Sequence, residues 1–184
     1  MSCKQCSVKH LDFKMRIILT IFLVSSLLVS RGQNSLSLTS KADTINYLIN
    51  LIQKDGLVSS PGTDFAGAPS KQYCRFVFLL SMTDNNQLLD LLNNSKGCLR
   101  IYAFMGLYHN KYDLLYKTKE ILKSDSTEVS SVSGCLYGTT TIAKAVDEIE
   151  QWYWKFQTDQ LLSLISSNKE FRNSQFNWVA DSKN

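Results

Sequence analysis

Cysteine and histidine are the side chains in this sequence that could carry covalent chemistry. The 184 residues include five cysteines and two histidines, and His109 is the one histidine after residue 32. A thiol beside an imidazole can act as a nucleophile with its general base. Cys135 with His109, or a serine near Cys135, would therefore make a small hydrolase. We favour the simpler interpretation that Cys135 is a small apolar residue buried under a loop and His109 a polar residue between two helices, which predicts no enzyme.

Other motifs give little support to metal or cofactor chemistry. Cys3 and Cys6 have the spacing of a metal-binding or redox pair, but no second pair of ligands follows them. The sequence contains no glycine-rich phosphate loop and no G-x-S-x-G motif. We therefore expect neither a metal nor a cofactor.

Arg100 is a charged residue in the first turn of an otherwise apolar segment, residues 98–109. Its guanidinium could recognise a ligand. We expect instead a structural ion pair that ties its helix to the next loop, with Asp84, Asp125 or Glu128 as partner. Removing one member of a buried pair costs about 3 to 5 kcal/mol, so Arg100→Met should destabilise the protein.

Three adjacent aromatic residues occur in "EQWYWKFQ", residues 150–157. Successive helical side chains point about 100° apart, so the three cannot all enter one core. Trp154 falls on the polar side, and we predict that it is exposed and anchors a partner. Packing of Trp154 against Phe176 or Trp178 is the alternative. The predicted core stripe of this helix comprises Ile142, Val146, Ile149, Trp152, Tyr153 and Phe156.

The net charge of +4 comes from the N-terminal segment. From Gln33 onward the sequence has 15 basic and 15 acidic residues, so this part is neutral. A neutral chain has no positive field to displace counterions from a phosphate backbone. We therefore expect no nucleic-acid partner.

The same N-terminal segment has the pattern of an export signal. Lys14 and Arg16 precede an apolar run, 17–29. Small residues follow this run, and we expect cleavage after Gly32. This run of 13 residues is shorter than the roughly 20 that span a bilayer, although an N-terminal membrane anchor is the alternative. Met15 is a possible true start. We expect an exported protein, periplasmic or secreted, with at most one internal disulfide among Cys74, Cys98 and Cys135.

Apolar periodicity predicts an all-α fold. Residues 43–55 form an amphipathic pattern with Asp43 or Thr44 as cap and Gly56 just past the end, and the Pro/Gly-rich stretch 57–70 is typical of a loop. Four short helices follow. Setting Arg75 over Arg100 gives a repeat of about 25 residues, each unit an apolar helix and an amphipathic one, as in a helical solenoid.

The apolar segment 98–109 has apolar residues on all sides, so it must be covered on more than one face, and Ala103 and Gly106 should allow a close helix contact. A Ser/Thr/Gly-rich connection, or a short β element around 129–132, comes next. Thr141 then caps a long C-terminal helix. The predicted organisation is an N-terminal extension and signal peptide (1–32), a leading helix and loop (33–70), a helical-repeat domain (71–167) and a tail (168–184).

Residues 86–146 resemble an uncharacterised family of exported Bacteroidota proteins. The resemblance rests on "RIYAFMGL", then "KYDLLYKTKEIL", "DSTEV", "GC" and "TIAKAV". It implies a HEAT-type helix and no known activity, and Ile101 and Met105 depart from its pattern. The residues on the pattern are Arg100, Tyr102, Ala103, Phe104, Glu128, Val129, Gly134 and Cys135.

The function that these observations favour is an interaction module. We expect an exported helical-repeat protein without catalysis, whose partner is an unidentified envelope protein and which has no membrane contact beyond the export signal. The structural residues of this prediction are Arg100, Tyr102, Phe104, Glu128 and Cys135, and the binding residue is Trp154. The hydrolase that uses Cys135 is the alternative function.

Overall fold

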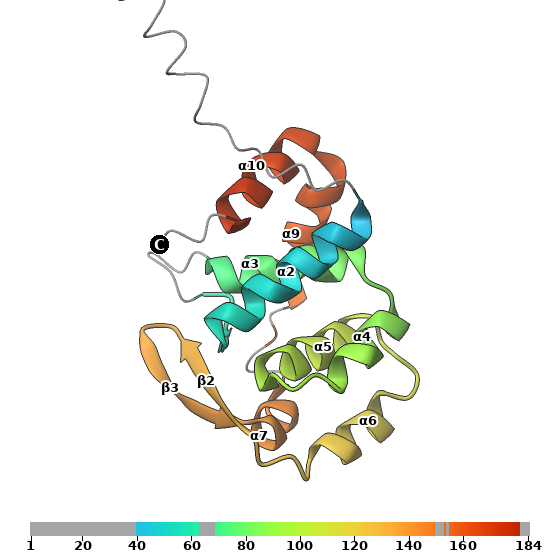
Figure 1. Cartoon of the computed structure of the whole chain (residues 1–184), viewed down its shortest axis with the longest axis vertical. Coiled ribbons are helices and arrows are strands. Elements are labelled where there is room, and N and C mark those ends of the chain that lie inside the picture. Colours follow the sequence, from blue (N-terminus) through green and yellow to red (C-terminus); the bar gives the residue numbers. More distant parts are fainter. Residues whose placement is uncertain (1–39, 63–68, 150–152, 154, 181–184) are drawn as a thin grey trace, which may run out of the picture. The chain divides into compact units, whose positions relative to one another are not determined.

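Helices make up most of the described chain. The structure is a computed structural model that describes residues 40–62, 69–149, 153 and 155–180, all within one compact unit, Thr39–Asn184. A small three-stranded sheet accompanies the helices (Figure 1). The expectation of a purely α-helical fold is therefore wrong, and the HEAT-like repeat stays a prediction. The expected export signal lies outside the described residues.

The first described helix, α2 (Lys41–Asp55), is flanked by residues suited to its two ends. The hydroxyl of Ser40 accepts a hydrogen bond from the backbone N–H of Asp43 at 3.1 Å, so the cap lies before the two residues that the sequence suggested. Gly56 ends the helix with a φ of 68°, which glycine adopts at little cost. The apolar face of α2 packs on α3 and α5.

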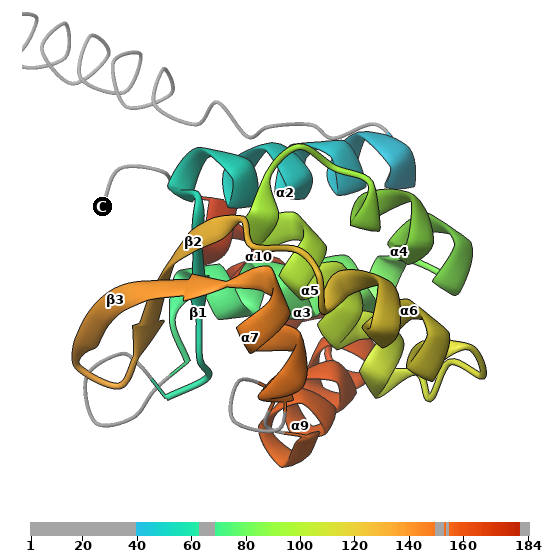
Figure 2. The ribbon, with the colours of Figure 1, turned by 90° about the horizontal axis from the view of Figure 1, so that it is seen from below.

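Helix α5 (Gly97–His109) lies in the middle of the fold. It contacts α2, α4 (Asn85–Leu92), α6 (Leu115–Leu122), α7 (Ile142–Asp147) and two strands. In Figures 1 and 2, α2 lies on one side of α5, and α6 and α7 lie on the other. These neighbours explain why apolar residues surround α5 on all sides. The prediction that Gly106 permits a close contact is confirmed, because a Cβ atom there would lie 2.9 Å from a methyl carbon of Leu88 on α4.

Helix α3 (Lys71–Met82) supplies the other large part of the core. Ser70 caps it by accepting a hydrogen bond from the backbone N–H of Tyr73 at 3.0 Å. Phe76 of α3 stacks on Tyr102 of α5, with ring centroids 5.0 Å apart. The apolar helices of the two predicted units are therefore joined by an aromatic contact.

The sheet has the order β1-β2-β3. Strand β1 (Leu57–Ser59) runs parallel to β2 (Glu128–Ser133), which pairs antiparallel with β3 (Leu136–Thr141). Gly134 has a φ of 58° at the first position of the two-residue turn between β2 and β3, as a type II′ turn requires. The predicted β element around 129–132 is thus present, whereas β1 lies in the stretch that was expected to be a loop.

The C-terminal part differs from the single long helix that was predicted. Thr141 caps α7, as expected, but this helix ends at Asp147. Helices α9 (Lys155–Ser167) and α10 (Lys169–Ala180) follow, so residues 169–180 are helical and not a loose tail. Phe156 is exposed on α9 rather than buried in the core stripe, while Ile149 and Tyr153 are buried.

Candidate functional site

Cys135 and His109, the pair of the alternative hydrolase function, lack the contacts of a nucleophile and its base. Cys135 occupies the second position of the β2–β3 turn, where its thiol is exposed. The expectation that Cys135 is buried is wrong, because a two-residue hairpin turn projects its side chains into solvent. His109 ends α5 and hydrogen-bonds through Nδ1 to the hydroxyl of Tyr153. The polar neighbour of the histidine is therefore a tyrosine and not the cysteine.

The surroundings of His109 also do not suit general-base catalysis. Asp159 Oδ1 lies 3.7 Å from the same Nδ1 atom that contacts Tyr153. In a catalytic triad the carboxylate contacts one ring nitrogen and the nucleophile contacts the other. Burial raises the pKa of Tyr153 to about 12, so its hydroxyl stays protonated at neutral pH. Burial also lowers the pKa of His109. The cluster connects α5 with the segment that leads into α9.

Arg100 forms an ion pair with Asp125, one of the three partners expected for it. Its Nη2 also donates a hydrogen bond to Thr127 Oγ1 at 3.1 Å. Both partners lie in the segment between α6 and β2. Arg100 thus joins α5 to the start of the sheet. Its side chain is partly buried, with an exposed fraction of 18%.

Of the other predicted structural residues, Tyr102 and Phe104 are buried, whereas Glu128 is exposed. Tyr102 is buried, and its hydroxyl accepts a hydrogen bond from the backbone N–H of Ser59 at 2.9 Å, which joins β1 to α5. Phe104 is buried on the side of α5 that faces α6 and α7. Glu128 is exposed at the start of β2.

The predicted binding residue, Trp154, lies outside the described residues, as does Trp152. Its two suggested packing partners are in α10. Phe176 contacts Phe78 edge to face, with ring centroids 5.7 Å apart, and Lys71 Nζ lies 5.7 Å from the centroid of the Trp178 ring. The contacts of Trp154 therefore stay a prediction.

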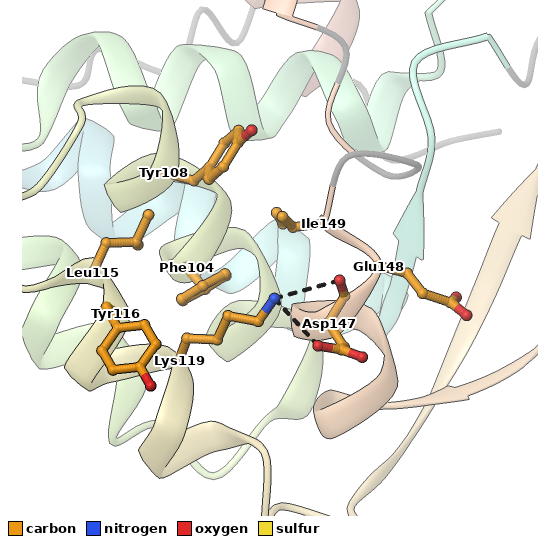
Figure 3. Close-up of a pocket in the computed structure, with 8 residues that line it drawn as sticks. All are labelled: Phe104, Tyr108, Leu115, Tyr116, Lys119, Asp147, Glu148 and Ile149. Atoms are coloured by element: carbon orange, nitrogen blue, oxygen red, sulfur yellow. Dashed lines mark hydrogen bonds and ion pairs between the residues drawn. The ribbon is translucent and has the colours of Figure 1, made fainter.

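A cleft of 410 Å³ opens between α5, α6 and the end of α7 (Figure 3). Its floor is apolar, since Phe104 and Ile149 are buried there. Tyr116, which is 75% exposed, stands at the edge on α6. The full lining comprises Phe104, Tyr108, Leu115, Tyr116, Lys119, Asp147, Glu148 and Ile149.

Lys119 and Asp147 form the polar part of this cleft. Lys119 Nζ lies 3.2 Å from Asp147 Oδ1 and 3.5 Å from the backbone oxygen of the same residue. Both contacts are drawn in Figure 3, where the carboxylate of Glu148 points away from Lys119. Sequence reasoning missed this site, because its residues come from α5, α6, the end of α7 and the segment after it, which only the fold brings together.

The cleft offers shape, apolar surface and charge, but no set of metal ligands. In the described ranges no three histidine, cysteine or acidic side chains are placed to hold a metal ion. Likewise, none of the helices that the structure describes has the length and apolar character to cross a membrane.

Comparison with known proteins gives no relative from which a role could be transferred. No protein-family model matches the chain, and no curated protein or solved structure matches it either. The resemblance to an exported Bacteroidota family therefore stays a prediction.

Proposed function

We propose that this chain is an exported interaction module of the cell envelope, without catalysis, which binds a segment of a partner protein in the cleft between α5, α6 and α7. The observation that carries the proposal is the lining of the cleft. Aromatic and aliphatic side chains surround one polar pair, a composition typical of sites that take up a side chain of another molecule. The exposed tyrosine at its edge is a residue type enriched in binding hot spots.

The surface of α6 beside the cleft also supports this role. Leu114, Tyr116 and Ile121 are large apolar side chains with more than half of their surface exposed. Single exposed apolar residues are common on soluble proteins. Two of them on the short helix α6, with Leu114 at its N-cap, beside a cleft are a reason to expect a partner there.

The alternative, a hydrolase that uses Cys135, has less support. A catalytic cysteine needs a neighbouring base or a positive charge to form its thiolate. The one histidine after residue 32 is bonded to Tyr153 instead. Labelling of Cys135 by a thiol reagent would not separate the two functions, because an exposed thiol reacts in either case.

Selection from a random peptide library on the purified protein tests the proposal, with affinities then measured by calorimetry. Selected peptides should lose about tenfold or more in affinity with Tyr116→Ala, since truncating an anchoring residue costs at least about 1.4 kcal/mol. Tyr137→Ala is the matched control, because Tyr137 is 83% exposed on β3 and does not line the cleft. Peptides that respond equally to both variants, or to neither, would refute a binding site in this cleft.

A further inference from the structure

The acidic corner of the cleft already holds a primary ammonium group. Asp147 is the last residue of α7, and carbonyl groups at the end of a helix lack intrahelical partners and carry partial negative charge. The backbone oxygen and the side-chain Oδ1 of Asp147 converge on one nitrogen atom, Lys119 Nζ. The chain's own lysine thus shows which chemical group this corner accepts.

The geometry of the corner favours ammonium over guanidinium. Arginine binds best to two acceptor oxygens that match its planar fork, as a carboxylate does when both of its oxygens are presented together. Here the two acceptors are a carbonyl oxygen and a single carboxylate oxygen, which converge on a compact donor. An ammonium group with three rotatable N–H bonds suits such an arrangement.

Lys119 can leave this place at little cost. The side chain of Lys119 is 28% exposed and that of Asp147 is 64% exposed, so water reaches this ion pair. Ion pairs open to water contribute about 0 to 1 kcal/mol to stability. An incoming ammonium group therefore competes with the cation of a partly exposed ion pair.

The apolar lining suits the rest of such a ligand. A four-carbon stem could lie along Phe104 and Ile149, and an aromatic face within about 6 Å attracts a cation. Tyr108 and Tyr116 provide two further aromatic rings. The cleft thus combines a path for an aliphatic chain with acceptors for a positive charge at its end.

We infer that the residue inserted into this cleft is a lysine of the partner protein, flanked by an apolar residue, and that its ammonium group replaces that of Lys119 on Asp147. This inference rests on the proposed function, because it specifies the ligand of the same site. It assigns Lys119 as an internal competitor of the ligand, so removing Lys119 should strengthen binding.

The test uses the peptide Ac-Leu-Lys-Phe-amide and its norleucine, arginine and glutamate analogues, titrated into the purified protein by NMR. We expect the lysine peptide to bind about two- to fivefold more tightly than the norleucine peptide, as for an exposed charge pair. Lys119→Met should tighten its binding by a similar factor. Lys123→Met is the matched control, since Lys123 pairs with Glu120 on the same helix.

Carboxylate variants give a second comparison. Asp147→Asn should weaken binding of the lysine peptide but not of the norleucine peptide. Glu148→Gln should have less effect, because its carboxylate points away from the ammonium group (Figure 3). Equal affinities for the lysine and norleucine peptides, or weaker lysine binding after Lys119→Met, would overturn this inference while leaving the cleft as a binding site. Library-selected peptides that ignore Tyr116→Ala would instead refute the proposed function.

Discussion

Arg75 and Arg100 occupy corresponding places in the predicted repeat, yet their surroundings differ. The Arg75 side chain is 3% exposed and contacts α10, α2 and its own helix, α3. Its Nε donates to the carbonyl of Val179 at 2.8 Å, and its Nη1 contacts Asp55 and Gln72. Arg100 is 18% exposed and bonds to Asp125 and Thr127 in one connecting segment. Arg75 thus connects helices in the interior, whereas Arg100 connects a helix to the segment that leads into the sheet.

This difference shows that similar sequence units need not have similar roles. Arg75 pairs with an aspartate earlier in the chain and Arg100 with one later in the chain. Moreover, the hydrogen bond of Arg75 to Val179 reaches α10, whereas the partners of Arg100 lie between α6 and β2. A symmetric repeat would give both arginines equivalent neighbours, so measuring what each contributes to stability tests whether the two regions are equivalent.

Arg75→Met should have the largest effect. It leaves the carbonyl of Val179 without its donor and removes the charge that pairs with Asp55. Asp55 is 38% exposed and can be hydrated, whereas a buried acceptor that loses its donor costs about 1 to 3 kcal/mol, and Arg75 bonds to two further acceptors, on Val179 and Gln72. We therefore expect a loss of about 3 to 5 kcal/mol in the free energy of unfolding measured with urea. A loss below about 1 kcal/mol would contradict the interior role of Arg75.

Arg100→Met should cost less, about 1 to 3 kcal/mol in the same measurement. Within the described part of the chain, its Nε is the one buried side-chain polar atom without a hydrogen-bond partner. Methionine removes this unsatisfied donor and keeps the apolar stem, which offsets part of the lost ion pair. Equal losses for the two arginine variants would mean that the two regions are equivalent, as a regular repeat requires.

Gly134→Ala tests the turn between β2 and β3, and β2 is the strand that follows the partners of Arg100 in the sequence. The φ of 58° at this position is unfavourable for a residue with a Cβ atom, although no atom lies within 4 Å of a Cβ built there. The expected loss is about 1 to 2 kcal/mol of unfolding free energy, from backbone strain alone. Thr139→Ala on the neighbouring strand, which keeps the turn intact, serves as the control.

The smallest expected effect concerns His109, which connects α5 with α9. Burial lowers its pKa in the folded state, so the unfolded chain takes up a proton first as the pH falls below 6.5. The stabilisation by neutral His109 is therefore complete above pH 6.5 and is lost as the pH falls through its folded-state pKa.

Urea unfolding at pH 7.5 and pH 5.5 measures this dependence. Wild-type protein should lose stability at the lower pH, and His109→Gln should lose less. An identical difference in both proteins would show that His109 does not contribute to the pH dependence.

Most of the helices before the sheet were predictable from local signals, whereas the residues of α10 were expected to form a tail. The stretch that became α5 has apolar residues on all sides, and Gly56 and Thr141 are suited to a helix end and a helix start, so these features follow from neighbours in sequence. Strand β1 could not be recognised, because three residues carry no periodicity and it is stabilised by pairing with β2, more than 70 positions later. The exposed position of Cys135 likewise depends on the hairpin around it.

The cleft could not be predicted from local sequence patterns for a related reason. Leu115 and Ile149 fit the apolar stripes of their own helices, which predicts that both are core residues. The hollow exists only because α6 and α7 approach α5 without filling the space between their ends (Figure 3). Arg100 was easier to interpret, because a single charge in an apolar helix requires a partner and few acidic residues were near enough in the sequence.

The contacts of α10 also set an order in time. The carbonyl of Val179 accepts from Arg75, and that of Ala180 accepts from Tyr47 at 3.1 Å. Both acceptors are synthesised after Arg75 and Tyr47, the residues that donate to them. The Nε of Arg75 therefore meets its acceptor only after synthesis has passed residue 180. Until then the newly made chain lacks these hydrogen bonds, which join α10 to α3 and to α2.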